Sequence, residues 1–464
     1  MSRLEFLGIT VLGDYILSEG IDCVLESLKR CGATAVACNP TVTFPAPDGT
    51  GSFQPPDDAG SSPRLFDRRL WGRRSLWVRG SPSYIPQIEY YSETPYRPRE
   101  ANDLTEQYGQ VIDDFVTEAV KAGLKVYLQV GAAQPPNLRE EDKPRLPDGR
   151  VPVNRMANTA SLASPAVRGY VRAYVRDLMD VYPQITGFRP DWPEYPCYKL
   201  DEAFQDFSPH VIKWGKDHGY DMSSIKNAVG YMYEKIHGKL TNEDLLDWVS
   251  PDYGRFALMN SLRAHPHVAE WFRLKADLSI DLLREWRQAL TEYGGEEKEL
   301  SANAFMPPYT LLTGFDFGRA SEFCSAVSPK LYTMHWTAMV EFWGRVILDS
   351  NPGLDEALVV RSLANLFDLE DQINADRLSD YGYPQPDEPH AVPDSPQKRK
   401  IRQVKSAAGP GMAITPLVHG YGPTDDFARR LQLVAESSVD GIWINRYGYL
   451  GDDKLDIIGS LRKA

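Results

Sequence analysis

The chain has 464 residues, of which 42% are hydrophobic, enough for the core of one large domain with insertions. Its 51 Lys and Arg residues against 64 Asp and Glu residues give a formal net charge of −13. This charge argues against nucleic acid or a membrane surface as the main partner and favours a small neutral molecule. The sequence has neither a basic segment followed by a long apolar run at its start nor an apolar stretch long enough for a membrane span, so we expect a cytoplasmic protein.

The first part of the chain alternates short apolar strands with helices. We predict strands over residues 4–11 and 33–38 on either side of a helix over residues 18–31. A second helix over residues 102–122 leads to a third strand over residues 124–130. This order of elements is typical of a parallel sheet with helices on its outer face.

Residues 44–100 interrupt this alternation with a stretch rich in Pro, Gly, Arg and aromatic residues. So long a loop inside a compact protein is typically a lid or a binding loop, and its tyrosines argue for order. We expect an insertion that either closes over the active site of its own chain or packs on a neighbouring subunit. A homo-oligomer is therefore left open.

The fourth strand candidate contains a proline and is followed by two acids. Its apolar run is broken by Pro190, after which Asp191 and Glu194 come among aromatic residues. Because proline cannot donate to a sheet ladder, we expect the strand to end near Phe188 or Arg189. Both acids would then lie just beyond the strand.

The second half of the chain resumes the alternation after residues 201–298, which have the pattern of helices almost throughout. We predict four further strands, over residues 300–305, 329–334, 412–418 and 441–445. The remaining predicted helices cover residues 164–181, 341–349, 355–374, 426–437 and 454–461.

Eight mostly apolar strands, each followed by helix, are the number found in a (β/α)₈ barrel. The predicted fold is α/β: a single TIM barrel over residues 1–464, with insertions at about 44–100 and 201–298. An open doubly wound sheet is the alternative. The absence of a GxGxxG or GxxxxGK[ST] phosphate loop disfavours it.

In such a barrel the residues at the strand ends face a single cleft. The residues expected there are polar, rich in amides and accompanied by aromatic rings, which suits the hydroxyl groups and flat faces of a sugar. We expect a small saccharide or glycoside as the ligand. The predicted binding residues are Asn39, Arg189, Trp192, Tyr195, Asn303, His335, Trp336, Asn445 and Arg446, with Thr10, Asp14, Gln129 and His419 at the same strand ends.

Asp191 and Glu194 are the predicted catalytic pair. Glycosidic bond cleavage needs one protonated carboxyl group and one ionised carboxylate, in surroundings that push their pKa values apart. The structural alternative is that either acid caps a backbone amine or pairs with an arginine such as Arg189. The identity of the second carboxylate is left open, with Glu341, Asp425 and Asp426 in reserve, although these three also suit helix caps.

Other chemistries have less support in the sequence. It contains no GxSxG elbow, no HExxH pair and no CxxC pair, and the acids and histidine of residues 387–390 lack a second cluster that would complete a metal site. We expect neither a metal nor another cofactor for the hydrolase. A metal-dependent sugar isomerase or epimerase, and a non-catalytic carbohydrate-binding barrel, remain as alternatives.

Residues 158–209 resemble a known family. They contain a helix that opens with SPAVR at residues 164–168, an acid-tipped fourth strand and, extending to residue 210, the segment FQDFSPH. These features resemble the glycoside-hydrolase-like (β/α)₈ proteins, in which SPxVR, an acidic end of strand four and F-x-x-F-x-P-H recur. The resemblance implies a barrel, a sugar substrate and an acid/base on Asp191 or Glu194. The family's nucleophile at the end of strand seven has no counterpart, because residues 415–421 hold no carboxylate.

Overall fold

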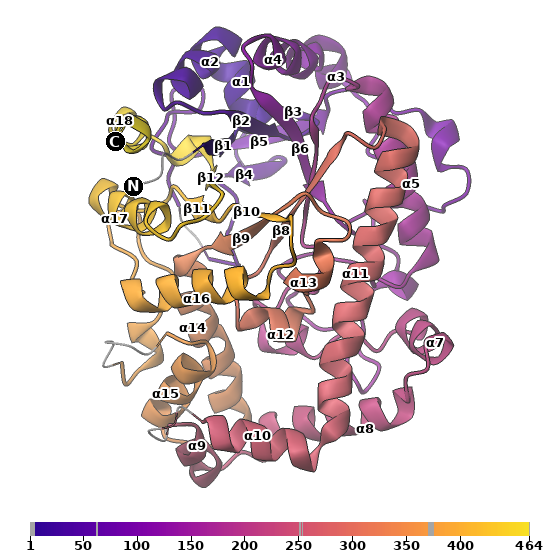
Figure 1. The fold of residues 1–464 in the computed structure, drawn as a ribbon, viewed down its shortest axis with the longest axis vertical. Helices are drawn as coiled ribbons and strands as arrows, with labels where there is room; N and C mark the ends of the chain where they lie inside the picture. Colours follow the sequence, from indigo (N-terminus) through magenta and orange to yellow (C-terminus); the bar gives the residue numbers. More distant parts are fainter. Residues whose placement is uncertain (1–4, 62–63, 250–251, 253, 370–374, 464) are drawn as a thin grey trace.

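The computed structural model describes residues 5–61, 64–249, 252, 254–369 and 375–463. Parallel strands close into an eight-stranded barrel (Figure 1), which confirms the predicted TIM barrel. The last strand pairs with the first and so closes the ring. In order around the ring, the strands are β1 (Phe6–Thr10), β2 (Ala35–Cys38), β6 (Lys125–Gly131), β7 (Gly187–Asp191), β8 (Glu299–Ala304), β9 (Ala326–Leu331), β11 (Leu417–His419) and β12 (Gly441–Asn445).

Large side chains fill the interior of the barrel. Trp443 on β12 belongs to a buried cluster inside the ring, and the guanidinium group of Arg189 on β7 lies 3.7 Å from the centre of its indole ring. A Cβ atom on Gly8 of the neighbouring β1 would lie 2.2 Å from the same ring, so only glycine leaves room for the tryptophan. The interior is therefore a packed core and not a pore.

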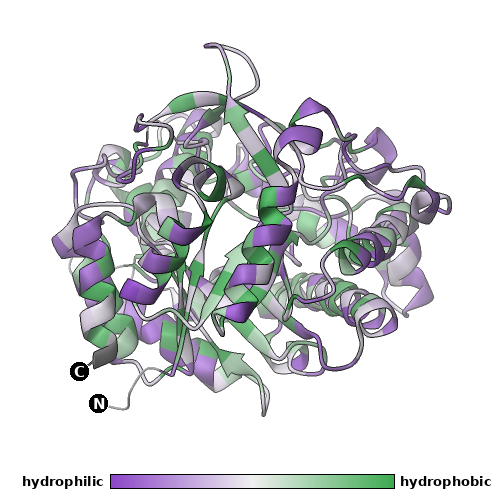
Figure 2. Ribbon diagram, turned by 90° about the horizontal axis from the view of Figure 1, so that it is seen from above, coloured by the Kyte–Doolittle hydropathy of each residue, from purple (hydrophilic) through white to green (hydrophobic). Residues whose placement is uncertain are grey.

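Helices surround the ring, and Figure 2 shows their hydrophilic residues mostly on the outer side, with apolar residues toward the strands. The helix after the third barrel strand is capped at its start, because Ser164 Oγ accepts a hydrogen bond from the backbone N–H of Val167. The helices of this layer are α1 (Gly13–Glu19), α2 (Ile21–Arg30), α3 (Asp103–Tyr108), α4 (Gln110–Lys121), α5 (Pro165–Val181), α12 (Tyr309–Thr313), α13 (Phe317–Ala320), α14 (Thr333–Ser350), α15 (Glu356–Leu366), α16 (Asp394–Ala407), α17 (Thr424–Ala435) and α18 (Asp452–Lys463).

The fourth barrel strand, β7, runs further than the sequence predicts. It continues through Pro190 to Asp191 while paired with β6. On its other side, the ladder to β8 omits Arg189 and Pro190, so the missing N–H of the proline falls in a gap of the pairing. The predicted end near Phe188 or Arg189 is therefore wrong, and Asp191 is the last residue of the strand.

The sixth barrel strand, β9, begins and ends earlier than predicted. Pro329 and Lys330, placed at the start of the strand by the sequence analysis, lie inside it, and α14 begins two residues after its end. His335 and Trp336 therefore lie in the first turn of a helix and not at the end of a strand. The expected strand-end position of these two residues is wrong.

Residues 44–100 contain more regular structure than a loop. Part of this segment joins an antiparallel sheet in the order β3 (Thr41–Pro45), β5 (Leu76–Pro82) and β4 (Ser52–Gln54). Between β4 and β5 the chain reaches the opposite side of the barrel, where Asp58 contacts His335 on α14. The segment thus crosses from the β2 side of the ring to the β9 side.

Helices occupy the chain between β7 and β8, and they extend away from the barrel in Figure 1. The longest, α11, runs along α5 and returns the chain to the barrel. The helices of this segment are α6 (Leu200–Ala203), α7 (Pro209–Asp217), α8 (Met222–Ile236), α9 (Asn242–Trp248), α10 (Arg255–Ala264) and α11 (Pro266–Gly294).

Two further predictions need correction at their ends. The predicted strand over residues 412–418 is divided into β10 (Ala413–Ile414), which pairs with β9, and β11. The predicted helix over residues 355–374 ends with α15 at Leu366, and residues 370–374 lie outside the described residues. Across the described ranges, no helix combines the length and the apolar character that a membrane crossing requires.

Candidate active site

A cavity of about 220 Å³ lies at the carboxyl ends of β1, β2, β6, β7 and β12. The βα loops of a TIM barrel gather at this end, where such enzymes carry their active sites. The cavity brings together four of the predicted site residues and several other strand-end residues. Its lining is Thr10, Leu12, Asn39, Gln129, Val130, Gly131, Gln134, Asp191, Asn445 and Arg446.

Several buried polar atoms of this lining have no hydrogen-bond partner among the described residues: Thr10 Oγ1, Asn39 Oδ1, Gln129 Oε1, Asn445 Oδ1 and Arg446 Nε. The Asn39 side chain is held in place, because its Nδ2 donates to the carbonyl oxygen of Gln129 at 2.7 Å. Buried polar groups are nearly always bonded in folded proteins. Acceptors and a donor that converge on one cavity therefore indicate a ligand with hydroxyl groups, which both donate and accept.

Asp191 presents the carboxylate of this cavity. Its Oδ1 lies 2.6 Å from Nζ of Lys330, whose side chain is 4% exposed, whereas the Asp191 side chain is 23% exposed. The same ammonium group lies 4.3 Å from the centre of the Trp192 ring. Trp192 has a φ of 55°, a backbone conformation that costs a non-glycine residue roughly 1 kcal/mol or more and that clusters at functional sites. Asp191 is thus ion-paired on one side and reachable from the cavity on the other.

Glu194 is fully buried and does not line the cavity. Its Oε1 accepts a hydrogen bond from the backbone N–H of Phe305 at 2.6 Å, and its Oε2 accepts one from the Thr313 hydroxyl. Burial raises the pKa of Glu194 to about 7, although both hydrogen bonds act to lower it. These contacts join the loop after β7 to the segment that follows β8.

Arg189 and Asn303 lie inside the barrel and are fully buried. Arg189 donates to Asn303 Oδ1 at 2.7 Å and to the hydroxyl groups of Ser301 and Ser328 at 3.1 Å each. Burial lowers the pKa of Arg189 to about 9. Neither residue lines the cavity, and their contacts join three neighbouring strands below it.

The three predicted aromatic residues, Tyr195, Trp336 and Trp192, do not lie together in one site. Tyr195 is fully buried, and its hydroxyl donates to Asp206 at 3.0 Å while accepting from the backbone N–H of Leu162 at 3.1 Å. Trp336 is 2% exposed and packs on Tyr309. Neither of these two rings reaches the cavity, whereas Trp192 lies beside the Asp191–Lys330 pair.

His335 belongs to a second polar cluster, built around Asp58. The Oδ2 atom of Asp58 lies 2.8 Å from His335 Nε2 and 3.0 Å from Arg64 Nη1, and it accepts a hydrogen bond from the Tyr383 hydroxyl at 3.0 Å. Burial acts to raise the pKa of Asp58, but Arg64 and His335 hold it well below its usual range. His419, at the end of β11, has a pKa well below its usual range because it is buried.

The reserve acids lie on helices and outside the cavity. Glu341 on α14 accepts hydrogen bonds from Arg345. Asp425 is exposed in the first turn of α17, and the neighbouring Asp426 accepts hydrogen bonds from two arginines of the same helix. In the part of the chain that the structure describes, no group of three or more His, Cys, Asp or Glu side chains is arranged to hold a metal ion.

Sequence reasoning did not single out Lys330, Gln134 or Asp58 as site residues. The signal for Lys330 was a charged residue within an apolar strand, which needs a partner when it is buried. Asp14 was placed at a strand end without a role. It is 5% exposed, its Oδ2 has no hydrogen-bond partner among the described residues, and burial raises its pKa, partly offset by Thr43 and Arg446.

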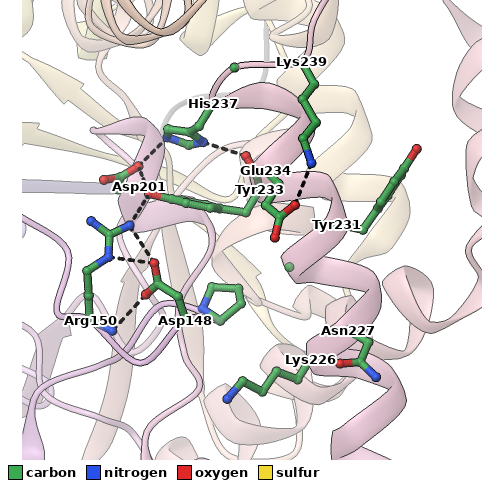
Figure 3. A pocket seen from close by; sticks show the side chains of 13 residues that line it. Asp148, Arg150, Asp201, Lys226, Asn227, Tyr231, Tyr233, Glu234, His237 and Lys239 are labelled. Atoms are coloured by element: carbon green, nitrogen blue, oxygen red, sulfur yellow. Dashed lines mark hydrogen bonds and ion pairs between the residues drawn. The ribbon is translucent and has the colours of Figure 1, made fainter.

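A larger hollow of about 1060 Å³ lies beside α8, away from the barrel mouth (Figure 3). Six of its side chains pair with one another, Arg150 with Asp148 at 2.6 Å, His237 with Asp201 at 2.7 Å, and Lys239 with Glu234 at 2.8 Å, whereas Lys226 also lines it outside these pairs. These pairs satisfy one another without a ligand, unlike the polar atoms of the mouth cavity. The smaller cavity is therefore the better candidate for the active site.

No family model matches the chain, and a search of curated proteins by sequence finds no match. Among solved structures, the chain is similar to the β-galactosidase from the psychrophilic Marinomonas ef1, with a TM-score of 0.54 and 11% identity over 99% of this chain and 59% of that one. It is also similar to the β-galactosidase from Bacillus circulans sp. alkalophilus, with a TM-score of 0.47 and 10% identity. This match covers 99% of this chain and 55% of that one. It is similar as well to the catalytic domain of the β-amylase from Paenibacillus polymyxa, with a TM-score of 0.47 and 9% identity. This match covers 97% of this chain and 94% of that one.

The chain spans less than two thirds of the length of the two β-galactosidase chains. At 11% identity the likeness to the Marinomonas protein shows the fold alone, the (β/α)₈ barrel. Function has to be argued from the site.

Proposed function

We propose that the chain is an enzyme of the glycoside hydrolase type, which cleaves the glycosidic bond of a small glycoside or oligosaccharide at the mouth cavity. The observation that carries this proposal is the convergence of unpaired amide and hydroxyl oxygens on a cavity that also holds the carboxylate of Asp191. The cavity volume of about 220 Å³ is smaller than the roughly 300 to 1,000 Å³ of typical drug-sized sites. It suits a ligand portion of about one sugar ring.

Asp191 is the proposed base or nucleophile of the reaction. Its Oδ1 lies 2.6 Å from the ammonium group of Lys330, which fixes the position of the carboxylate at the cavity. An ionised carboxylate can attack the anomeric carbon or take a proton from water, the two roles that glycosidic cleavage assigns to the second carboxyl group. Lys330 and Trp192 are the proposed positioning residues that hold it at the cavity.

Asp14 is the proposed proton donor, although it lies in the first turn of α1, not at a strand end, and does not itself line the cavity. Burial raises its pKa, so it holds a proton more readily than an exposed aspartate, and Arg446 of the cavity lining lies close enough to act on that pKa. Its Oδ2 has no hydrogen-bond partner among the described residues. Glu194 was predicted for one of these two roles. Both of its oxygens are occupied away from the cavity, so we propose it as a positioning residue for the loop after β7.

A non-catalytic carbohydrate-binding barrel is the second candidate. One observation favours it: β11, the seventh barrel strand, ends in His419, and no carboxylate occupies that strand end. Such a protein would bind saccharides through the same amide-rich cavity without cleaving them.

A screen against aryl glycosides and natural disaccharides, with and without a chelator, separates these functions from a metal-dependent isomerase. We expect sugar release that survives the chelator and falls by about 10² or more in Asp14→Asn. Interconversion of free sugars that the chelator abolishes would indicate the isomerase. Saccharide binding with no turnover on any substrate would indicate the binding barrel, and either result would contradict the proposal.

A further inference from the structure

An apolar pocket of about 470 Å³ lies in the helical part of the molecule, between α8 to α11 on one side and α14 and α15 on the other. It shares no lining residue with the mouth cavity. Aromatic and aliphatic side chains make up most of its wall, including the indole rings of Trp248, Trp271 and Trp343. No part of the proposed hydrolase mechanism uses this pocket.

Small residues of α10 keep the pocket open. Ala257, Ser261 and Ala264 follow one another at the spacing of a single helix face, and all three line the pocket. On the same helix, Phe256 and Met259 are 76% and 65% exposed and do not line it. The pocket side of α10 thus carries three small side chains beside Leu258 and Asn260, while its two largest exposed apolar side chains, Phe256 and Met259, lie outside the pocket.

An apolar pocket of this size between packed helices is unusual, and it is partly open to solvent, because Asn260 and Ala264 of its wall are exposed. Interiors pack at the density of organic crystals, with few voids larger than one water molecule, and apolar cavities bind apolar molecules readily. The volume of about 470 Å³ lies within the roughly 300 to 1,000 Å³ of small-molecule sites. This makes a small molecule a better occupant than a partner protein, which needs a broad surface patch of about 800 Å² on each side.

Three charged side chains line the pocket, those of Lys235, Asp244 and Asp247. Lys235 and Asp244, both in the wall, form an ion pair of 2.6 Å. The remaining polar side chains of the wall include Asn260, Ser261 and Ser362, and the Ser362 hydroxyl donates a hydrogen bond to the carbonyl oxygen of Leu245. Because Lys235 and Asp244 are paired with each other, neither offers an unpaired opposite charge to a charged ligand. A neutral ligand avoids the cost of moving a charge out of water.

We infer that this pocket is a binding site for a small, neutral, mainly apolar molecule, such as one with an aromatic ring system or a short hydrocarbon chain. The inference does not rest on the proposed hydrolase function, because the two cavities have separate linings. The bound molecule would lie against the indole rings of the wall and beneath the small residues of α10.

N-phenyl-1-naphthylamine, a neutral apolar fluorescent probe, tests this site in the full-length protein. We expect saturable binding at about one probe per chain, with energy transfer from the tryptophans of the pocket wall. Ser261→Phe fills the space beneath α10 and should weaken the binding by about tenfold or more. The matched control Met259→Phe adds the same ring on the exposed face of the same helix and should leave binding within about twofold.

Thermal unfolding with and without the probe provides a second measurement. The probe should raise the unfolding temperature of the wild type and of Met259→Phe, but not that of Ser261→Phe, which also shows whether the variant is folded. Absence of saturable binding to the wild type would overturn the inference. So would binding that a folded Ser261→Phe retains, because the probe would then occupy another surface.

Discussion

Asp191 and Glu194 are three residues apart in the chain, yet their carboxyl groups have different surroundings. Asp191 ends a barrel strand and reaches the mouth cavity, whereas Glu194 is buried against the backbone that follows β8. The left-handed backbone of Trp192 lies between them and changes the direction of the chain. The sequence alone does not distinguish the two acids. In the structure, Asp191 is available to a ligand, whereas Glu194 holds the loop after β7 against the segment that follows β8.

Replacing Glu194 by glutamine should change how stability depends on pH. Burial raises the pKa of Glu194 from 4.5 to about 7, so the folded state holds this proton more tightly than the unfolded state. The resulting stabilisation is complete below pH 4.5 and is lost as the pH rises to about 7, a total of roughly 3 kcal/mol. We compare the free energy of unfolding of the wild type with that of Glu194→Gln. The wild-type value minus the variant value should fall between pH 4.5 and about 7 and stay constant at higher pH.

Denaturant unfolding at a series of pH values measures this difference. Glu322→Gln, the same chemical change at an exposed position, is a suitable control. A difference between wild type and Glu194→Gln that is flat from pH 4.5 to 7 would show that the folded state does not hold this proton.

The sequence predicts several residues of the cavity, but not the side chains that contact them. Asn39, Asn445 and Asp191 could be placed at the cavity because each follows a recognisable apolar strand. The Lys330 partner of Asp191 could not, since this pair joins strands distant in the chain and depends on the register of β9, which the Pro329–Lys330 pair obscured. The burial of Tyr195 and Trp336 likewise depends on packing that no local pattern reveals.

At the scale of elements, the chain between β4 and β5 is tied to the barrel through Asp58. This carboxylate contacts His335, Arg64 and Tyr383, which come from three different parts of the chain. Although burial opposes its ionisation, Arg64 and His335 keep its pKa low, so its stabilising contribution is present at neutral pH and is lost as the pH falls through that lowered pKa. Asp58 is therefore ionised at neutral pH and contacts Arg64 and His335 as a carboxylate.

Asp58→Asn should loosen this segment at neutral pH. The amide carries no charge for Arg64 or His335, so we expect faster cleavage by thermolysin within residues 44–100 and little change elsewhere. Mass mapping of the first fragments locates the cut. Asp57→Asn, at the exposed neighbouring position, should cleave at the wild-type rate, and equal rates for all three proteins would show that Asp58 does not hold the segment in place.

Elements with a continuous apolar run were predicted well, and interrupted ones were not. The strand over residues 441–445 agrees with β12 because acidic and basic residues flank an unbroken apolar segment. Prolines inside β7 and β9 led to wrong strand ends, since in both cases the sheet accommodates the missing donor. The antiparallel strands of residues 44–100 were missed because they are short and interrupted by glycine and proline.

At the scale of the whole molecule, closure of the barrel assembles the site from both ends of the chain. Pairing of β12 with β1 brings Asn445 and Arg446 beside Thr10, while β2, β6 and β7 supply the other polar groups of the cavity. The number and order of the strands sufficed to predict the barrel, whereas only the ends of β1, β2, β6, β7 and β12 line the cavity, which the strand order could not show. The helices between β7 and β8 add a separate apolar pocket, whose small α10 residues carried no functional signal by themselves.

Asp191 is proposed to act on a sugar held in the mouth cavity, and the turnover of Asp191→Asn is the decisive measurement. On the best glycoside from the screen, kcat/KM should fall by about 10² to 10⁴, while the affinity for that glycoside stays within about threefold in calorimetry. Glu341→Gln, a matched change on the outside of the barrel, should retain wild-type turnover. If Asp191→Asn keeps more than about a third of the wild-type kcat/KM, Asp191 is not the catalytic carboxylate and the account fails.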